Sequence, residues 1–201
     1  KIVYRTEKYG DKVRTFCMNP KGSVVNENTN GIITVNGHSY EDPAKQTENT
    51  NFALLVSYEF EDPFNNPNLY GKEIASLANR LSNGSVIVQK YGDIKKGRRS
   101  TQKRIDEGFV KPTLKEAVPG DLGLVLLYNV MKSLIEMVEA LDTVTPGIAN
   151  DHTLFYGVEA KFYITDGFEN GTDVPAAELS ATKTGNTYTV TVPANISKIS
   201  F

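Results

Sequence analysis

Hydrophobic and polar residues alternate in short blocks along the first third of the chain. Apolar strings occupy Val13–Phe16, Ile32–Val35 and Phe52–Val56, and polar turns separate them. Valine, isoleucine, threonine and phenylalanine favour strands, so each string predicts one. Asn19–Gly22 contains Pro20 and Gly22 and predicts a turn. We therefore expect Ser23–Asn26 to return beside the first strand as a hairpin. The run Phe52–Val56 is continuous enough for a strand buried on both faces.

Further along, the spacing of apolar residues changes to that of helices. Leu69–Leu81 predicts a helix that ends in left-handed geometry at Asn83-Gly84. Its buried stripe consists of Ile74, Leu77, Ala78 and Leu81. A longer helix is expected at about Leu122–Leu141, with Asp121 as its N-cap.

The remaining extended segments complete the predicted architecture. Val86–Val88 and Leu154–Ile164 predict strands, and the second of these has one polar face. In the tail, Thr187–Val192 alternates cleanly and is expected to pair with Ile196–Phe201. The predicted fold class is α+β: a curved, mostly antiparallel sheet covered by two main helices (69–81 and 122–141), with a C-terminal β-hairpin. We expect one domain over 1–164 and a β-rich tail over 165–201.

Several ordered strings in the chain resemble one family. These are RTFCMNPKG (14–22), VNGHSY (35–40), ENTNFALLVS (48–57), GDIKKGRRS (92–100) and TLFYGVEAKFY (153–163). They are similar to the middle region of the uncharacterised FAD-dependent dehydrogenases, also called NAD(FAD)-utilising dehydrogenases. The resemblance covers about residues 1–164. It implies a substrate or cap domain inserted into a flavin-binding fold. In many members a second cysteine stands two residues after the first, where this chain has Asn19.

The same resemblance implies a cofactor and partners. The parent protein would use FAD, and the partners would be the flavin-binding halves of the same polypeptide and a small-molecule substrate. The chain itself contains no G-x-G-x-x-G string, the usual pyrophosphate-binding sequence. We therefore expect no cofactor in this chain alone and no activity of the isolated chain. It starts at Lys1 without a signal peptide, so we expect an excised or processed segment.

Composition excludes several other classes. The 201 residues carry a net charge of −2, which argues against nucleic acid as a partner. No apolar run approaches the roughly 20 residues of a membrane span, so we expect no membrane and a cytoplasmic location. The single cysteine excludes an internal disulfide, and two histidines without a spaced carboxylate motif predict no metal site.

Six residues are candidates for chemistry or binding. Cys17 is the weak catalytic candidate, because the neighbouring Arg14 would favour its thiolate; the alternative is a buried structural thiol. His38 is a candidate substrate ligand or a loop residue. Arg98 and Arg99 lie in a basic stretch, Lys90–Arg104, which predicts a loop that forms either an anion clamp or a solvated charged surface. Glu159 either lines a pocket or pairs with Lys161 at the surface.

A second function class also fits the sequence. The alternating tail and the ten tyrosines are compatible with a cell-surface or carbohydrate-binding β-rich module. Saturable binding to glycans would favour this class over the flavoprotein domain.

Overall fold

A computed structural model describes residues 1–159, 168–169, 172–173, 181–184, 187–190 and 198–200, with side chains described through Glu159. The fold is α+β, as predicted. Predictions that fall on residues 160–164, including a pairing of Glu159 with Lys161, lie outside the described residues.

The central sheet has the strand order β1-β2-β5-β13 and is antiparallel throughout. Its strands are β1 (Val3–Arg5), β2 (Lys12–Asn19), β5 (Asn51–Glu59) and β13 (Lys198–Ser200). Val13 pairs with Val56 and Arg14 with Leu55 in the β2–β5 ladder. Leu55 and Val56 are both fully buried although they point to opposite faces, so β5 is covered on both sides there.

The predicted hairpin between β2 and the following strand is wrong. β3 (Ser23–Thr29) pairs with β4 (Ile32–His38) in a separate two-stranded sheet. β2 pairs with β1 along Lys12–Arg14 and with β5 along most of its length, whereas the whole of β3 is taken up by its pairing with β4. Asn30 and Gly31 connect β3 to β4 with φ of 53° and 83°, as expected for an Asn-Gly hairpin turn.

A third sheet has the order β7-β6-β8. β6 (Ile87–Lys90) runs parallel to β7 (Val118–Pro119) and antiparallel to β8 (Leu154–Gly157). β8 ends at Gly157, so Val158 and Glu159 do not continue the strand predicted over 154–164.

Helix α1 (Pro67–Leu81) confirms the first predicted helix. Its predicted buried stripe is only partly right, because Ala78 is buried whereas Leu77 and Leu81 are exposed. Asn66 caps it by accepting from the Leu69 N–H at 3.0 Å, and the chain leaves it through left-handed Asn83 and Gly84. The basic stretch after β6 is not the predicted loop. It forms the short helices α2 (Tyr91–Lys95) and α3 (Gln102–Asp106). A further short 3₁₀ turn, η1, spans Pro43–Lys45.

The second long helix begins later than predicted. Asp121 caps a 3₁₀ turn, η2 (Leu122–Leu124), and α4 runs over Tyr128–Val144. Leu122 is held in place because its N–H donates to Gln89 Oε1 at 2.8 Å and its side chain is buried. Leu127 is extended, with ψ of 147°, so a regular helix can begin only after it.

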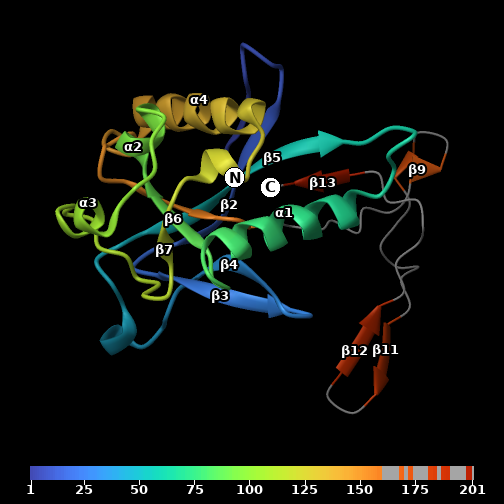
Figure 1. Ribbon diagram of the computed structural model, residues 1–201, viewed down its shortest axis with the longest axis horizontal. Helices are drawn as coiled ribbons and strands as arrows, with labels where there is room; N and C mark the ends of the chain where they lie inside the picture. The colour runs from blue at the N-terminus through green and yellow to red at the C-terminus, as the bar shows by residue number, and fades with distance from the viewer. Residues whose placement is uncertain (160–167, 170–171, 174–180, 185–186, 191–197, 201) are drawn as a thin grey trace.

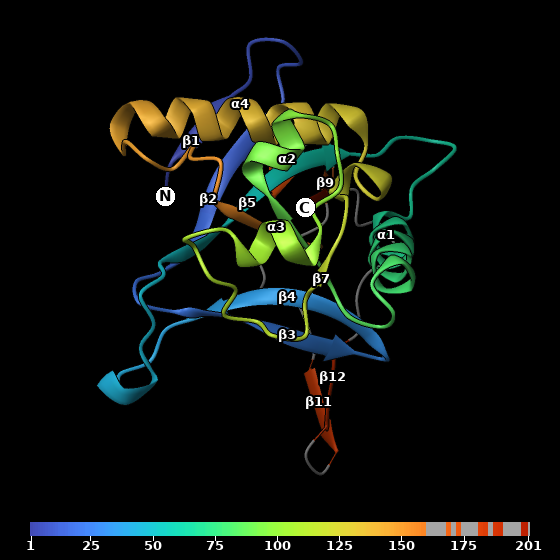
Figure 2. The same ribbon diagram turned by 60° about the vertical axis from the view of Figure 1, so that its left-hand side comes forward.

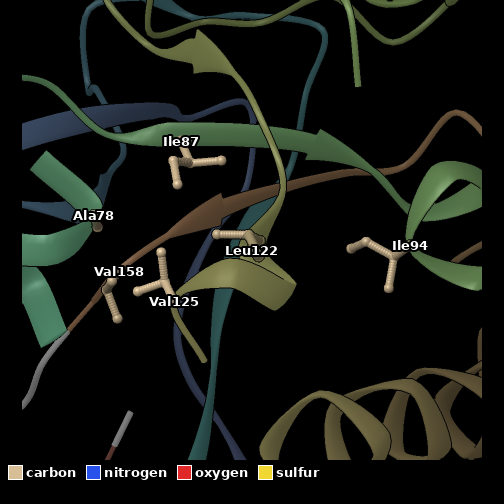
Figure 3. Close-up of a cluster of buried hydrophobic side chains, with 6 residues drawn as sticks. All are labelled: Ala78, Ile87, Ile94, Leu122, Val125 and Val158. Carbon is tan, nitrogen blue, oxygen red and sulfur yellow. The ribbon is translucent and has the colours of Figure 1, made fainter. Parts of the chain in front are cut away.

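The elements form layers. Helix α4 lies along one side over β2 and β5, while the β3–β4 hairpin lies on the opposite side (Figures 1 and 2). Val13 and Val56 pack against buried residues of α4, including Val130 and Met137. A second cluster joins α1, β6, η2 and the chain after β8 (Figure 3). Its buried members are Ala78, Ile87, Ile94, Leu122, Val125 and Val158.

The tail departs from its predicted pairing. β12 (Thr187–Val190) pairs with β11 (Ala181–Thr184), and β13 pairs with β5 rather than with β12. Two further short strands, β9 (Phe168–Glu169) and β10 (Thr172–Asp173), pair with each other. Among the helices of the described residues, none is long and apolar enough to cross a bilayer.

Candidate functional site

Arg14, Cys17 and Glu159 come together although Glu159 is far from the other two in sequence. Arg14 is only 7% exposed, on the face of β2 opposite to Val13. Burial lowers the pKa of the Arg14 guanidinium, and electrostatic interactions with Glu159 and, to a smaller extent, with Cys17 offset part of that effect. The guanidinium also lies 5.3 Å from the centre of the Phe16 ring. Three of the six predicted residues thus form one charged group.

Cys17 has an unusual backbone. Its φ is 45°, and the β2–β5 register shifts between Phe16 and Asn19. A bulge turns its side chain out of the regular alternation, and the thiol is exposed. The alternative of a buried structural thiol is therefore wrong. Left-handed geometry costs a non-glycine residue roughly 1 kcal/mol, so neighbouring contacts must hold it.

Two asparagines supply those contacts. Asn19 Nδ2 donates to the Cys17 carbonyl at 2.7 Å and to Asn51 Oδ1 at 3.0 Å. Gly37 lies against both amides, since a Cβ at this position would collide with Asn19 Nδ2 and Asn51 Oδ1. None of these three was a sequence candidate. In the sequence, the place of Asn19 two residues after the single cysteine was the available signal.

A cavity of about 520 Å³ lies beside this group, and Glu159 belongs to its lining. One wall comes from the first half of β5, another from α4, and a third from β8 and the residues after it. The apolar part of the lining includes Val35, Phe52, Leu54, Leu126, Val130, Leu134 and Phe155. The polar part includes Asn36, Asn49, Asn51, Thr113, Tyr156 and Glu159. Burial raises the pKa of Tyr156 to about 12, so its hydroxyl stays neutral in the folded protein at ordinary pH.

The histidines do not join this site. His38 is exposed at the end of β4, where its ring meets Tyr40 edge-on with centroids 4.8 Å apart, and it does not line the cavity. His152 packs against Phe109 and contacts the Lys90 ammonium through Nδ1 at 3.3 Å. Within the part of the chain that the structure describes, no three His, Cys, Asp or Glu side chains are grouped to hold a metal ion.

Arg98 and Arg99 lie apart from the cavity. Arg98 Nε donates to the buried Asp93 carboxylate at 2.7 Å, whereas Arg99 is exposed. Neither lines the cavity, so the structure separates them from the group around Arg14.

The sequence matches the family described as FAD-dependent protein, C-terminal domain-like, over residues 1–162. This chain belongs to that family. An uncharacterized protein of Clostridium beijerinckii is 31% identical over 173 residues, which cover 80% of this chain and 31% of that protein. The chain therefore spans about a third of the length of this relative.

The match to the FAD-dependent family does not show whether this chain itself holds a flavin. The turn from β6 into α2 is the nearest approach to the strand-to-helix turn that holds a pyrophosphate. There, the Asp151 side chain packs on Gly92, because a Cβ at Gly92 would lie 2.8 Å from Asp151 Cβ. The Asp151 side chain thus occupies the space over this turn, so the turn leaves no room for a phosphate.

Proposed function

We propose that residues 1–164 form the substrate-facing domain of an FAD-dependent oxidoreductase of the NAD(FAD)-utilising dehydrogenase type. The flavin would be held by other segments of the same polypeptide, and this domain would bind the small-molecule substrate. The 520 Å³ cavity is the observation that carries the proposal. Pockets for small molecules usually measure roughly 300–1,000 Å³ and combine apolar walls with a few polar groups.

The lining indicates the kind of substrate. Leu126, Leu134 and Phe155 offer apolar contact, so the body of the substrate is apolar. Asn51 and Glu159 lie at the same cavity and supply polar partners that would fix its orientation. Since Glu159 also interacts with Arg14, the charged group containing Cys17 adjoins the bound substrate.

Cys17 has no assigned chemical step. A dithiol reaction requires a second cysteine, and this chain contains one. The residues of this domain would bind and orient the substrate, and the flavin would supply the redox chemistry.

Filling the cavity tests the substrate site. The wild-type chain is expected to bind the apolar fluorescent dye anilinonaphthalene sulfonate in the cavity, with a rise in emission. Leu126→Trp places a large side chain in the cavity and should weaken dye binding. Leu81→Trp, at an exposed position 47% accessible on α1, is the matched control. Equal dye affinity of the two variants would contradict a ligand-binding cavity.

The flavin part has a separate test. The purified 201-residue chain should be colourless, whereas the longer Clostridium beijerinckii relative should copurify with a flavin that NADH or NADPH bleaches. A colourless relative would contradict the oxidoreductase proposal. Stoichiometric FAD on the 201-residue chain would contradict the assignment of the cofactor to other segments.

A further inference from the structure

Two arginine side chains are anchored on one buried carboxylate, away from the cavity. The Asp93 side chain is 3% exposed and accepts from Arg98 Nε at 2.7 Å and from Arg104 Nε at 3.1 Å. The fully buried Ser100 donates its hydroxyl to the same carboxylate at 2.7 Å. These contacts with the core therefore hold the guanidinium groups of Arg98 and Arg104 in place. The guanidinium group of an ordinary surface arginine is mobile.

Attachment through Nε leaves the outer nitrogens of Arg98 available. Among the described residues, Asp93 is the partner of the Arg98 side chain, which is 49% exposed. Arg104 uses Nη2 to donate to the Arg99 carbonyl. The two Nη groups of a guanidinium match the oxygens of a phosphate, so an anchored Arg98 is prepared for a two-point contact.

The lysines nearby are already engaged. Lys95 and Lys96 contact Asp151 at 2.9 and 3.7 Å, and Lys90 Nζ donates to the Arg104 carbonyl at 3.3 Å. The arginine groups that remain to receive a ligand are Arg98, the outer part of Arg104 and the exposed Arg99.

The charge of this region is opposite to that of the whole protein. Residues 90–111 contain eight Lys or Arg and three Asp or Glu, a net charge of +5, although the chain as a whole carries −2. Asp93 neutralises one of the three arginine charges, so the group retains positive charge for an incoming anion. A concentrated positive field attracts anions over about 8 Å at physiological ionic strength.

We propose that Arg98, together with Arg99 and Arg104, binds a phosphate-class oxyanion, with the pyrophosphate group as the best fit. A pyrophosphate carries several negative charges and enough oxygens to contact more than one guanidinium. The site uses arginine side chains rather than a helix N-terminus. The anion site does not depend on the cavity. The anion-site proposal can therefore fail while the substrate-site proposal holds, and the substrate-site proposal can fail while the anion-site proposal holds.

Calorimetric titration of the 201-residue chain with inorganic pyrophosphate, and separately with ADP, tests the site at low ionic strength. Wild type should bind pyrophosphate saturably, and added sodium chloride should weaken it. Arg98→Ala should weaken binding by roughly tenfold to a hundredfold, the usual effect of losing charge-assisted hydrogen bonds. Arg98→Lys keeps the positive charge but loses the planar pair of guanidinium donors, so its affinity for pyrophosphate should stay close to that of Arg98→Ala. Arg80→Ala, at an exposed position in the last turn of α1, should bind like wild type.

The arms of the titration separate the sources of the anion. If ADP binds at least as tightly as pyrophosphate and loses affinity in Arg98→Ala, the site takes the diphosphate of a nucleotide. If pyrophosphate alone binds in this way, the site takes the free anion. No saturable binding of either probe, or equal loss in Arg98→Ala and Arg80→Ala, would overturn the proposal. Thermal melts of each variant check that the fold is intact. Arg99→Ala, at an exposed residue, provides a second test and should also weaken pyrophosphate binding.

Discussion

Replacing Asp93 with alanine should destabilise the protein far more than replacing any exposed carboxylate. The Asp93 side chain is 3% exposed, and Ser100, Arg98 and Arg104 all donate to it. The variant leaves a buried serine hydroxyl without its acceptor and two arginines without their anchor.

The size of the effect follows from the exposure of each partner. The buried Ser100 contact is a hydrogen bond to a charged group, worth about 2 kcal/mol. Arg98 and Arg104 are 49% and 31% exposed, so solvent screens these pairs and each adds about 0.5 kcal/mol. The expected loss is about 3 kcal/mol, which lowers the melting temperature of a domain of this size by roughly 6–12 °C.

Acid should remove the same stabilisation from the wild type. Burial raises the pKa of Asp93, but the hydrogen bonds from Ser100, Arg98 and Arg104 lower it by more, so the net shift is downward. A folded pKa below the unfolded value of about 3.9 stabilises the protein above that pH. The contribution is lost as pH falls through the folded pKa. The difference between wild type and Asp93→Ala should therefore be full at neutral pH and shrink below about pH 4.

Thermal or urea unfolding, followed by circular dichroism at several pH values, measures this. Asp151→Ala is the matched control, because Asp151 also meets two cations, Lys95 and Lys96, but at an exposed position. It should leave the melting temperature nearly unchanged. Equal melting temperatures for the two variants at neutral pH, or a difference that does not fall in acid, would refute the reasoning.

Three further predictions concern the cavity and the bulge. Gly37→Ala should cost about 1–3 kcal/mol in urea unfolding, because the new methyl group meets Asn19 and Asn51, and adding Asn19→Ala should cost less than the sum of the two single changes. Additive costs would contradict this contact. The near-ultraviolet tyrosinate signal of Tyr156, isolated by comparison with Tyr156→Phe, should appear only as pH approaches about 12. The stability from its neutral form is present below the unfolded pKa of about 10 and is lost as pH rises through about 12; titration near 10 would contradict the burial. Native protein should react with a thiol-specific dye at one site per chain, because Cys17 is exposed. Reaction only after unfolding would contradict the exposed bulge.

The sequence predicted those elements that local patterns determine. The apolar spacing of Leu69–Leu81 and the left-handed exit at Asn83-Gly84 correspond to α1 and its end. The start of α4 was missed because Leu122 has a local helical pattern but a tertiary role, with its N–H bound to Gln89 from β6. Local spacing carries no information about such a partner.

Strand pairing shows the same limit. The turn Asn19–Gly22 was predicted correctly, yet β2 and β3 do not pair across it. The Asn30-Gly31 dipeptide was the stronger hairpin signal and joins β3 to β4. Which strand takes the edge of β2 depends on β5, which lies about 40 residues later, and no short-range pattern encodes this choice.

Residue type was enough to select some of the site residues from the sequence. It did not show which of the candidates lie together in the fold. Arg14, Cys17 and Glu159 were candidates and do lie together, but the same reasoning also chose His38, Arg98 and Arg99, which lie elsewhere. The bulge explains how the side chains of Arg14 and Cys17 come to lie near each other. Three positions apart in a regular strand, their side chains would point to opposite faces. The extra residue between Phe16 and Asn19 changes the alternation, and Asn19 holds the changed backbone through the Cys17 carbonyl. Asn19, two residues after the cysteine, therefore supplies the amide that fixes the backbone of Cys17.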